Sequence, residues 1–162
     1  MLNLDKILLI SDTHGNHKLL EKVLKHNHDC KYLIHLGDEP DDLEHHPELT
    51  SDMQIFYVYG IFHHKWTEQN ASNKFMIKNT RFKIAHTPAD IKVEEHDHIY
   101  CFGHTHHRHF ERDGKSLYIN PGHLKNNNDR GEVAGYVVIE LKDDVKIKFF
   151  DYKHKLLEVQ RV

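Results

Sequence analysis

Six potential metal ligands follow closely after apolar runs in this sequence. They are Asp12 and His14 in Ser-Asp-Thr-His-Gly, Asp38 in Leu-Gly-Asp, His86 in Ile-Ala-His, and His104 and His106 in Phe-Gly-His-Thr-His. A mixed set of carboxylate and imidazole ligands suits manganese, iron, nickel or zinc better than magnesium or calcium, which prefer oxygen-only ligands. This set of residues is typical of a metal enzyme.

The apolar runs themselves predict the strands that would position these ligands. We expect an α/β fold with a helix over Gly15–His28, whose apolar residues recur at helical spacing. The predicted strands are Lys6–Ile10, Tyr32–Leu36, Gln54–Tyr59, Lys74–Ile77, Arg81–Ala85, Ile99–Phe102, His109–Arg112, Ser116–Ile119, Gly135–Leu141 and Val145–Tyr152. Because the carboxyl ends of neighbouring parallel strands lie side by side, ligands that are distant in sequence can share one ion.

Length, charge and cysteine content limit the class of protein. The 162 residues fit one compact domain, so we expect a single domain over residues 1–162. The net charge of −3 provides no basic field, so we do not expect nucleic acid as a partner except as a substrate. Cys30 and Cys101 suggest neither a disulfide framework nor a thiolate site, which favours the cytoplasm. No apolar run is long enough for a signal peptide or a membrane span.

Histidine is so frequent that its motifs must be weighed against chance. With 18 histidines in 162 residues, about two His-x-His pairs are expected from composition alone, and the chain has four. The pairs at residues 26 and 28, 96 and 98, and 107 and 109 are interpreted as solvated surface. Gly103-His104-Thr105-His106 differs because a glycine directly after an apolar strand lets the backbone turn and aim both imidazoles at the sheet edge.

The motifs occur in an order that resembles a known family. Asp-x-His, Gly-Asp, a lone histidine and Gly-His-x-His, followed by Asn120-Pro121-Gly122, resemble the calcineurin-like metallophosphoesterases, in particular the small single-domain phosphodiesterases of bacteria and archaea. The resemblance implies a four-layer sandwich of two mixed β-sheets flanked by helices. It also implies two divalent transition-metal ions, with manganese favoured and nickel, iron or zinc possible.

The resemblance further implies a role for each ligand. One ion would be bound by Asp12, His14 and His106 and the other by His86 and His104, with Asp38 bridging both. The implied activity is hydrolysis of phosphate esters by a metal-bound hydroxide, and we expect phosphodiesters to be the substrates.

The third motif of the family is altered in this chain. Where relatives have Gly-Asn-His-Asp or a close variant, this chain has Gly60-Ile61-Phe62-His63, and an isoleucine cannot bind a metal. We therefore consider His63, with His64 as a weaker candidate, as a catalytic residue that fills the altered position. The alternative is that Ile61 and Phe62 pack in the core while both histidines lie in a solvated loop.

Other assignments remain open on the sequence alone. Arg130 could bind the substrate phosphate or could be an ordinary solvated arginine. The loss of the asparagine ligand also leaves the alternative of a catalytically weak or silent binding module on the same fold, as in the retromer subunit that resembles this family. A third alternative is a histidine-rich metal buffer, which would bind many ions weakly.

Overall fold

The computed structural model describes residues 3–93 and 98–162, so His96 of one histidine pair lies outside the described residues. The first half of the chain contains β1 (Asp5–Ile10), α1 (His17–His26), β2 (Tyr32–His35), η1 (Pro40–His45), α2 (Pro47–Thr50), β3 (Gln54–Tyr57), η2 (Glu68–Asn70) and β4 (Ser72–Ile77). The second half contains β5 (Thr80–Ala85), η3 (Pro88–Asp90), β6 (His98–Cys101), β7 (Arg108–Asp113), β8 (Ser116–Pro121), β9 (Asn128–Asp129), β10 (Glu132–Val133), β11 (Gly135–Leu141), β12 (Val145–Asp151) and β13 (Leu156–Arg161).

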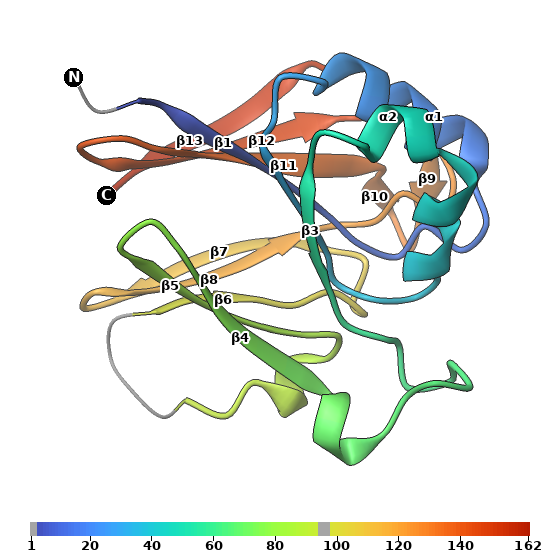
Figure 1. The fold of residues 1–162 in the computed structure, drawn as a ribbon, viewed down its shortest axis with the longest axis horizontal. Coiled ribbons are helices and arrows are strands. Elements are labelled where there is room, and N and C mark those ends of the chain that lie inside the picture. The colour runs from blue at the N-terminus through green and yellow to red at the C-terminus, as the bar shows by residue number, and fades with distance from the viewer. Residues whose placement is uncertain (1–2, 94–97) are drawn as a thin grey trace.

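Two mixed sheets face each other, as Figure 1 shows. The six-stranded sheet has the order β13-β12-β11-β1-β2-β3, and its strands β1, β2 and β3 are parallel. The five-stranded sheet has the order β4-β5-β6-β8-β7, and its strands β5, β6 and β8 are parallel. Each sheet therefore contributes several parallel strands whose carboxyl ends can carry a site.

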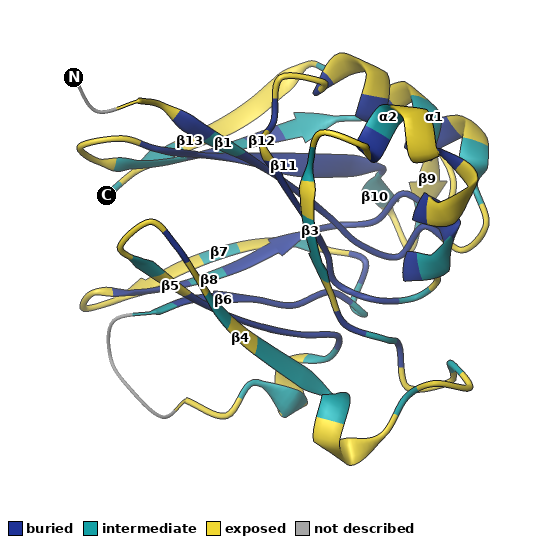
Figure 2. Cartoon of the chain, in the orientation of Figure 1, coloured by how far each residue is buried: buried dark blue, intermediate teal, exposed yellow. Residues whose placement is uncertain are grey.

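Alternation along β1 explains how the layers are held together. Ile7 and Leu9 face the apolar cluster between the sheets, whereas Leu8 and Ile10 face a second cluster beneath α1. All four side chains are fully buried, and Figure 2 shows buried residues concentrated in the central strands of both sheets, whereas the edge strands β13 and β7 are largely exposed. A strand buried on both faces reads as a continuous apolar run, which is why Ile7 to Ile10 show no polar alternation.

The observed architecture confirms the predicted α/β sandwich of two mixed sheets, with few helices. Helix α1 begins after Asn16, whose side chain accepts a hydrogen bond from the Leu19 amide (3.1 Å), and it is shorter than predicted. Neither the short β9-β10 pair around Asn128 nor β13 was predicted. Among the described residues, no helix is both long and apolar enough to cross a bilayer.

Candidate metal centre

The predicted ligands lie at one end of the sandwich, in the loops after β1, β2, β5 and β6. These loops lie at the end opposite the two chain termini in Figure 1. Asp12 and His14 follow β1, Asp38 follows β2, His86 directly follows β5, and His104 and His106 follow β6. The convergence arises because parallel strands of both sheets end on the same side.

Four of the six predicted residues form one compact donor group. One potential ligand atom from each of Asp12, His14, Asp38 and His106 lies within 4.8 Å of those of the other three. His106 Nε2 lies 3.1 Å from Asp12 Oδ1 and 3.3 Å from His14 Nε2. Nitrogen and oxygen donors this close around a common point could hold a cation.

Asp38 connects this group to the remaining two histidines. Its Oδ2 lies 3.3 Å from His14 Nε2, and its Oδ1 lies 3.3 Å from His86 Nε2. The ring of His104 lies beside that of His86, with a centroid distance of 5.1 Å. The two carboxylate oxygens of Asp38 therefore face histidines on two sides.

The backbone is strained at most of these positions. Five of the six residues have a positive φ, a conformation uncommon for residues other than glycine. They are Asp12 (54°), His14 (46°), Asp38 (54°), His104 (67°) and His106 (64°). Such conformations persist where the surrounding structure enforces them, and they cluster at functional sites.

Two glycines allow the loops to approach each other. A Cβ on Gly60 would overlap Asp38 Oδ1, and a Cβ on Gly103 would overlap Ser11 Oγ and Asp12 Oδ2. Gly60 begins the altered third motif, so this glycine retains a clear steric purpose although the residues after it have changed.

Buried polar atoms without partners point to a missing positive charge. Asp12 is fully buried, and its Oδ2 accepts hydrogen bonds from the His104 amide (3.1 Å) and the Ser11 hydroxyl. Its Oδ1 has no hydrogen-bond partner among the described residues. The His86 ring donates through Nδ1 to Leu36 O (2.8 Å), and its Nε2 likewise has no hydrogen-bond partner there. A divalent cation would satisfy both atoms, so these residues fit a metal.

Protons compete with a cation for this site. Burial alone would raise the pKa of Asp38, but the His86 imidazole 3.3 Å from its Oδ1 and the nearby His14 imidazole lower it to about 2. Burial opposes protonation of His86 and His106, yet the carboxylates of Asp38 and Asp12 raise the pKa of each imidazole. Acid should therefore displace a bound metal from these histidines.

A carboxylate not predicted from the sequence orients His106. Asp129, on β9, accepts a hydrogen bond from His106 Nδ1 at 2.5 Å, which leaves Nε2 directed at the donor group. Metal-binding histidines commonly donate their second ring nitrogen to a carboxylate in this way. The only sequence signal for Asp129 was its place in the polar stretch Asn126–Asp129.

A second unpredicted network fixes the loop that carries Asp12 and His14. His35 Nδ1 accepts from the Gly37 amide (3.2 Å), so its Nε2 donates to Thr13 Oγ1 (3.2 Å), and that hydroxyl donates to Asp42 Oδ2 (2.6 Å). Burial lowers the pKa of His35 to about 4, which agrees with this neutral tautomer. These residues were missed because hydrogen-bond partners on different loops leave no periodic pattern.

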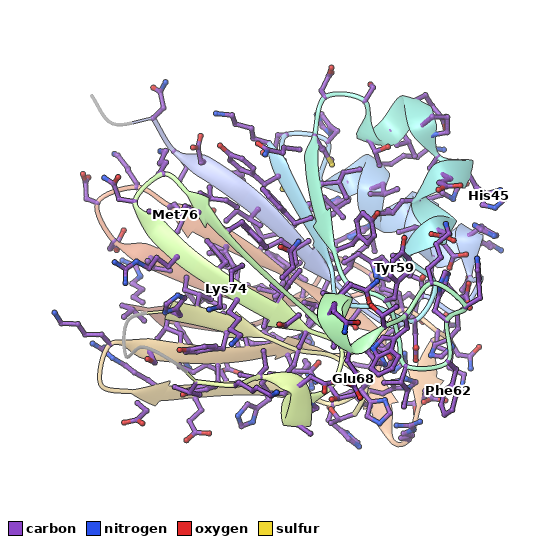
Figure 3. All side chains as sticks on the ribbon, turned by 60° about the horizontal axis from the view of Figure 1, so that its bottom comes forward. His45, Tyr59, Phe62, Glu68, Lys74 and Met76 are labelled. Carbon is purple, nitrogen blue, oxygen red and sulfur yellow. The ribbon has the colours of Figure 1, made fainter. Side chains whose placement is uncertain are left out.

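The altered third motif is directed outward. Ile61 is 37% and Phe62 is 92% exposed, so the interpretation that both pack in the core is wrong. The cause is a turn closed by the His63 amide donating to Gly60 O (2.9 Å), and Figure 3 shows Phe62 at the edge of the molecule. His63 Nε2 lies 3.2 Å from Asp41 Oδ2 and its ring stacks on His64, so the contacts of His63 lie outside the donor group.

Arg130 lies beside the Gly-His-x-His loop. Its Nη1 donates to the carbonyls of His104 (3.1 Å) and Thr105 (3.4 Å), and its Nε lies 3.6 Å from Asp129 Oδ2. About half of the side chain is exposed. The guanidinium is therefore attached to the rim of the candidate centre, and its contact with a phosphate stays a prediction.

Comparison with known proteins agrees with the geometry. Residues 6–144 match the model of the calcineurin-like phosphoesterase superfamily domain. None of the functionally curated proteins matches the chain significantly. A conserved protein of Streptococcus pneumoniae, described as a predicted phosphoesterase, has a TM-score of 0.74 at 21% identity. The superposition covers 100% of this chain and 99% of the Streptococcus protein.

Two further solved structures share the fold at low identity. YfcE, a phosphoesterase from E. coli, has a TM-score of 0.74 at 18% identity, with 96% of this chain and 98% of YfcE covered. Vps29 from Entamoeba histolytica, complexed with Zn²⁺, has a TM-score of 0.67 at 16% identity, with coverages of 97% and 98%. Because the family match spans most of the sequence, the chain belongs to the calcineurin-like phosphoesterase superfamily.

Proposed function

We propose that this protein is a phosphodiesterase that uses two divalent transition-metal ions. The observation that carries the proposal is the placement of Asp38, whose two oxygens each lie 3.3 Å from a different histidine. A carboxylate in this position has the chemistry to bridge two cations. We assign Asp12, His14 and His106 to one ion, His86 and His104 to the other, and Asp38 to both, with manganese favoured.

When bound, two such ions would lower the pKa of a water and stabilise the attacking and leaving oxygens of phosphoryl transfer. The protein contributes preorganisation. Asp12 is held through Oδ2, His86 through its bond to Leu36 O, and His106 through Asp129. Each of these three ligands thus presents one free donor atom in a fixed direction, which limits the reorganisation needed during reaction.

We assign the substrate phosphate to the rim that carries Arg130. Nη1 of Arg130 is occupied by two carbonyls, whereas Nη2 makes no hydrogen bond within the described part of the chain. A guanidinium with a free terminal nitrogen can pair with a phosphate oxygen. Its half-exposed position beside His104 supports this assignment.

The leaving group would receive little help from the third motif. Ile61 offers no ligand and Phe62 offers no proton, so esters whose leaving groups have low pKa values, such as aryl esters, should react fastest. His63 stays a proposed catalytic residue with His64 as the weaker candidate; His63→Ala and His64→Ala test them separately, with the exposed His28→Ala as control. Unchanged metal occupancy and turnover in His63→Ala would remove His63 from the mechanism.

The direct test is hydrolysis of an activated aryl phosphodiester. We expect turnover with Mn²⁺ or Ni²⁺ to exceed turnover with Mg²⁺, and Asp12→Asn to abolish it while the exposed Asp143→Asn leaves it unchanged. Equal rates with Mg²⁺, or no turnover with any transition ion, would contradict the proposal. A phosphomonoester measured in parallel tests the preference for diesters.

The two cysteines support our proposal of a cytoplasmic location. Cys30 and Cys101 are buried free thiols, as expected in a reducing compartment. Burial raises the pKa of Cys30 to about 12 and also raises that of Cys101. Both therefore stay protonated, which argues against a thiolate metal site.

A binding module is the second candidate function, and the exposure of Phe62 favours it. Phe62, Ile61 and Tyr57 are large apolar side chains at 92%, 37% and 44% exposure. Exposed apolar surface is commonly used for contacts with partners. Tight binding of two ions without turnover of any phosphate ester would favour this function over catalysis.

A further inference from the structure

Three histidines gather at a place separate from the candidate centre. His17 lies at the start of α1, His45 ends η1, and His46 precedes α2. The ring centroid of His17 lies 4.5 Å from that of His45 and 5.7 Å from that of His46. These spacings bracket the 5.1 Å and 5.3 Å between paired histidine rings of the candidate centre.

Two ring nitrogens of this cluster are buried without partners. His17 Nδ1 and His46 Nε2 have no hydrogen-bond partner among the described residues. His46 is only 8% exposed, so its unpaired nitrogen is costly unless something satisfies it. Neutral imidazole nitrogens with free lone pairs are the commonest protein ligands of zinc-type ions.

Asp42 supplies the accompanying carboxylate. Its Oδ1 lies 3.7 Å from His17 Nε2, which leaves the unpartnered Nδ1 of His17 for another interaction. At 3.7 Å this is a charge contact and not a hydrogen bond, so Asp42 contributes its negative charge beside the His17 ring. The side chain of Asp42 is almost fully buried, so its negative charge is poorly screened.

We propose that His17, His45 and His46 bind one additional transition-metal ion of the zinc type, with the buried charge of Asp42 beside His17 favouring a cation. The donor nitrogens lie farther apart than those of the candidate centre, so binding requires a ring to turn. His45 is exposed and can turn without displacing packed atoms, as its position at the surface in Figure 3 shows. Three imidazoles and one water complete the tetrahedral coordination that zinc prefers.

The test is zinc stoichiometry, measured by equilibrium dialysis and native mass spectrometry. We compare wild type with His17→Ala and His45→Ala, and we use His28→Ala as the control because His28 is also exposed and its Nδ1 lies 3.1 Å from Lys25 O, away from this cluster. Asp42 is left unchanged because its Oδ2 also accepts from the Gly15 amide (2.8 Å) near the candidate centre. We expect both test variants to bind one zinc ion fewer, or to bind it at least about tenfold more weakly, than wild type and His28→Ala.

A second measurement addresses His46, whose burial makes its replacement a risk to folding. Zinc should shift the ¹⁵N resonance of His46 Nε2 in wild type, and this shift should be absent in His45→Ala at the same zinc concentration. Equal stoichiometry and affinity in all four proteins would overturn the proposal. Equal losses in His28→Ala and the test variants would also overturn it, because they would indicate diffuse binding to surface histidines.

Discussion

Replacing Asp129 by asparagine removes a charge without removing volume. The Asp129 carboxylate accepts from His106 Nδ1 at 2.5 Å, and its next partners, Lys125 Nζ and Arg130 Nε, are farther away at 3.4 and 3.6 Å. Loss of such a carboxylate behind a metal-binding histidine typically weakens metal affinity by about 10- to 100-fold, or about 1.4 to 2.7 kcal/mol. We expect the lower half of this range, because the asparagine oxygen can still accept the hydrogen bond.

Calorimetric titration with Mn²⁺ measures this effect, with kcat/KM on an aryl phosphodiester as the second readout. Asp143→Asn is the matched control, because it removes the same charge from an exposed turn between β11 and β12. Wild-type affinity in Asp129→Asn would refute the conclusion that Asp129 orients a metal ligand. A loss of affinity that equals the loss in Asp143→Asn would show only a general charge effect.

Two further predictions concern the loops that support the site. Gly60→Ala places a Cβ against Asp38 Oδ1, so we expect weaker metal binding and a loss of about 1 to 3 kcal/mol in unfolding free energy. The control is Gly114→Ala, whose added Cβ meets open space and which should retain wild-type metal affinity. Burial holds the pKa of His35 at about 4, below its ordinary value of 6.5. The unfolded chain therefore binds a proton that the folded chain excludes between about pH 6.5 and 4, and stability should fall by on the order of 3 kcal/mol as pH decreases through this window. Denaturant unfolding in the presence of a chelator should show that the unfolding free energy of His35→Asn depends less steeply on pH than that of wild type. Parallel curves for the two proteins would show that His35 does not cause the loss of stability.

Most of the strands, and the gathering of the predicted ligands at one end of the sandwich, could be predicted from the sequence for one physical reason. An apolar run that is followed at once by a metal-binding side chain marks the end of a buried strand, and parallel strands bring such ends together. Gly103 was chosen because a glycine lets the backbone turn, whereas the structure shows that a Cβ at this position would overlap Ser11 Oγ and Asp12 Oδ2. The positive φ values of five of the six predicted ligands could not be read from the sequence.

The supporting residues and the third motif were beyond a single sequence. Asp129 and His35 act through hydrogen bonds to residues 23 and 22 positions away, and such pairs leave no local pattern. The alternative that placed Phe62 in the core was wrong for a different reason: hydrophobic character favours burial, but the turn at Gly60 directs this side chain outward. Strand β13 was missed because most of its residues are exposed, so it lacks the apolar run that marked the other strands.

Metal stoichiometry measured together with turnover, on wild type and Asp38→Asn, tests most directly whether one carboxylate joins two ions. The difference between the two proteins is the relevant quantity, because any ion bound at the separate histidine cluster cancels. We predict that Asp38→Asn weakens both ions of the centre and that turnover falls with them. Two ions bound by Asp38→Asn with wild-type affinity and undiminished turnover would contradict the bridging role of Asp38.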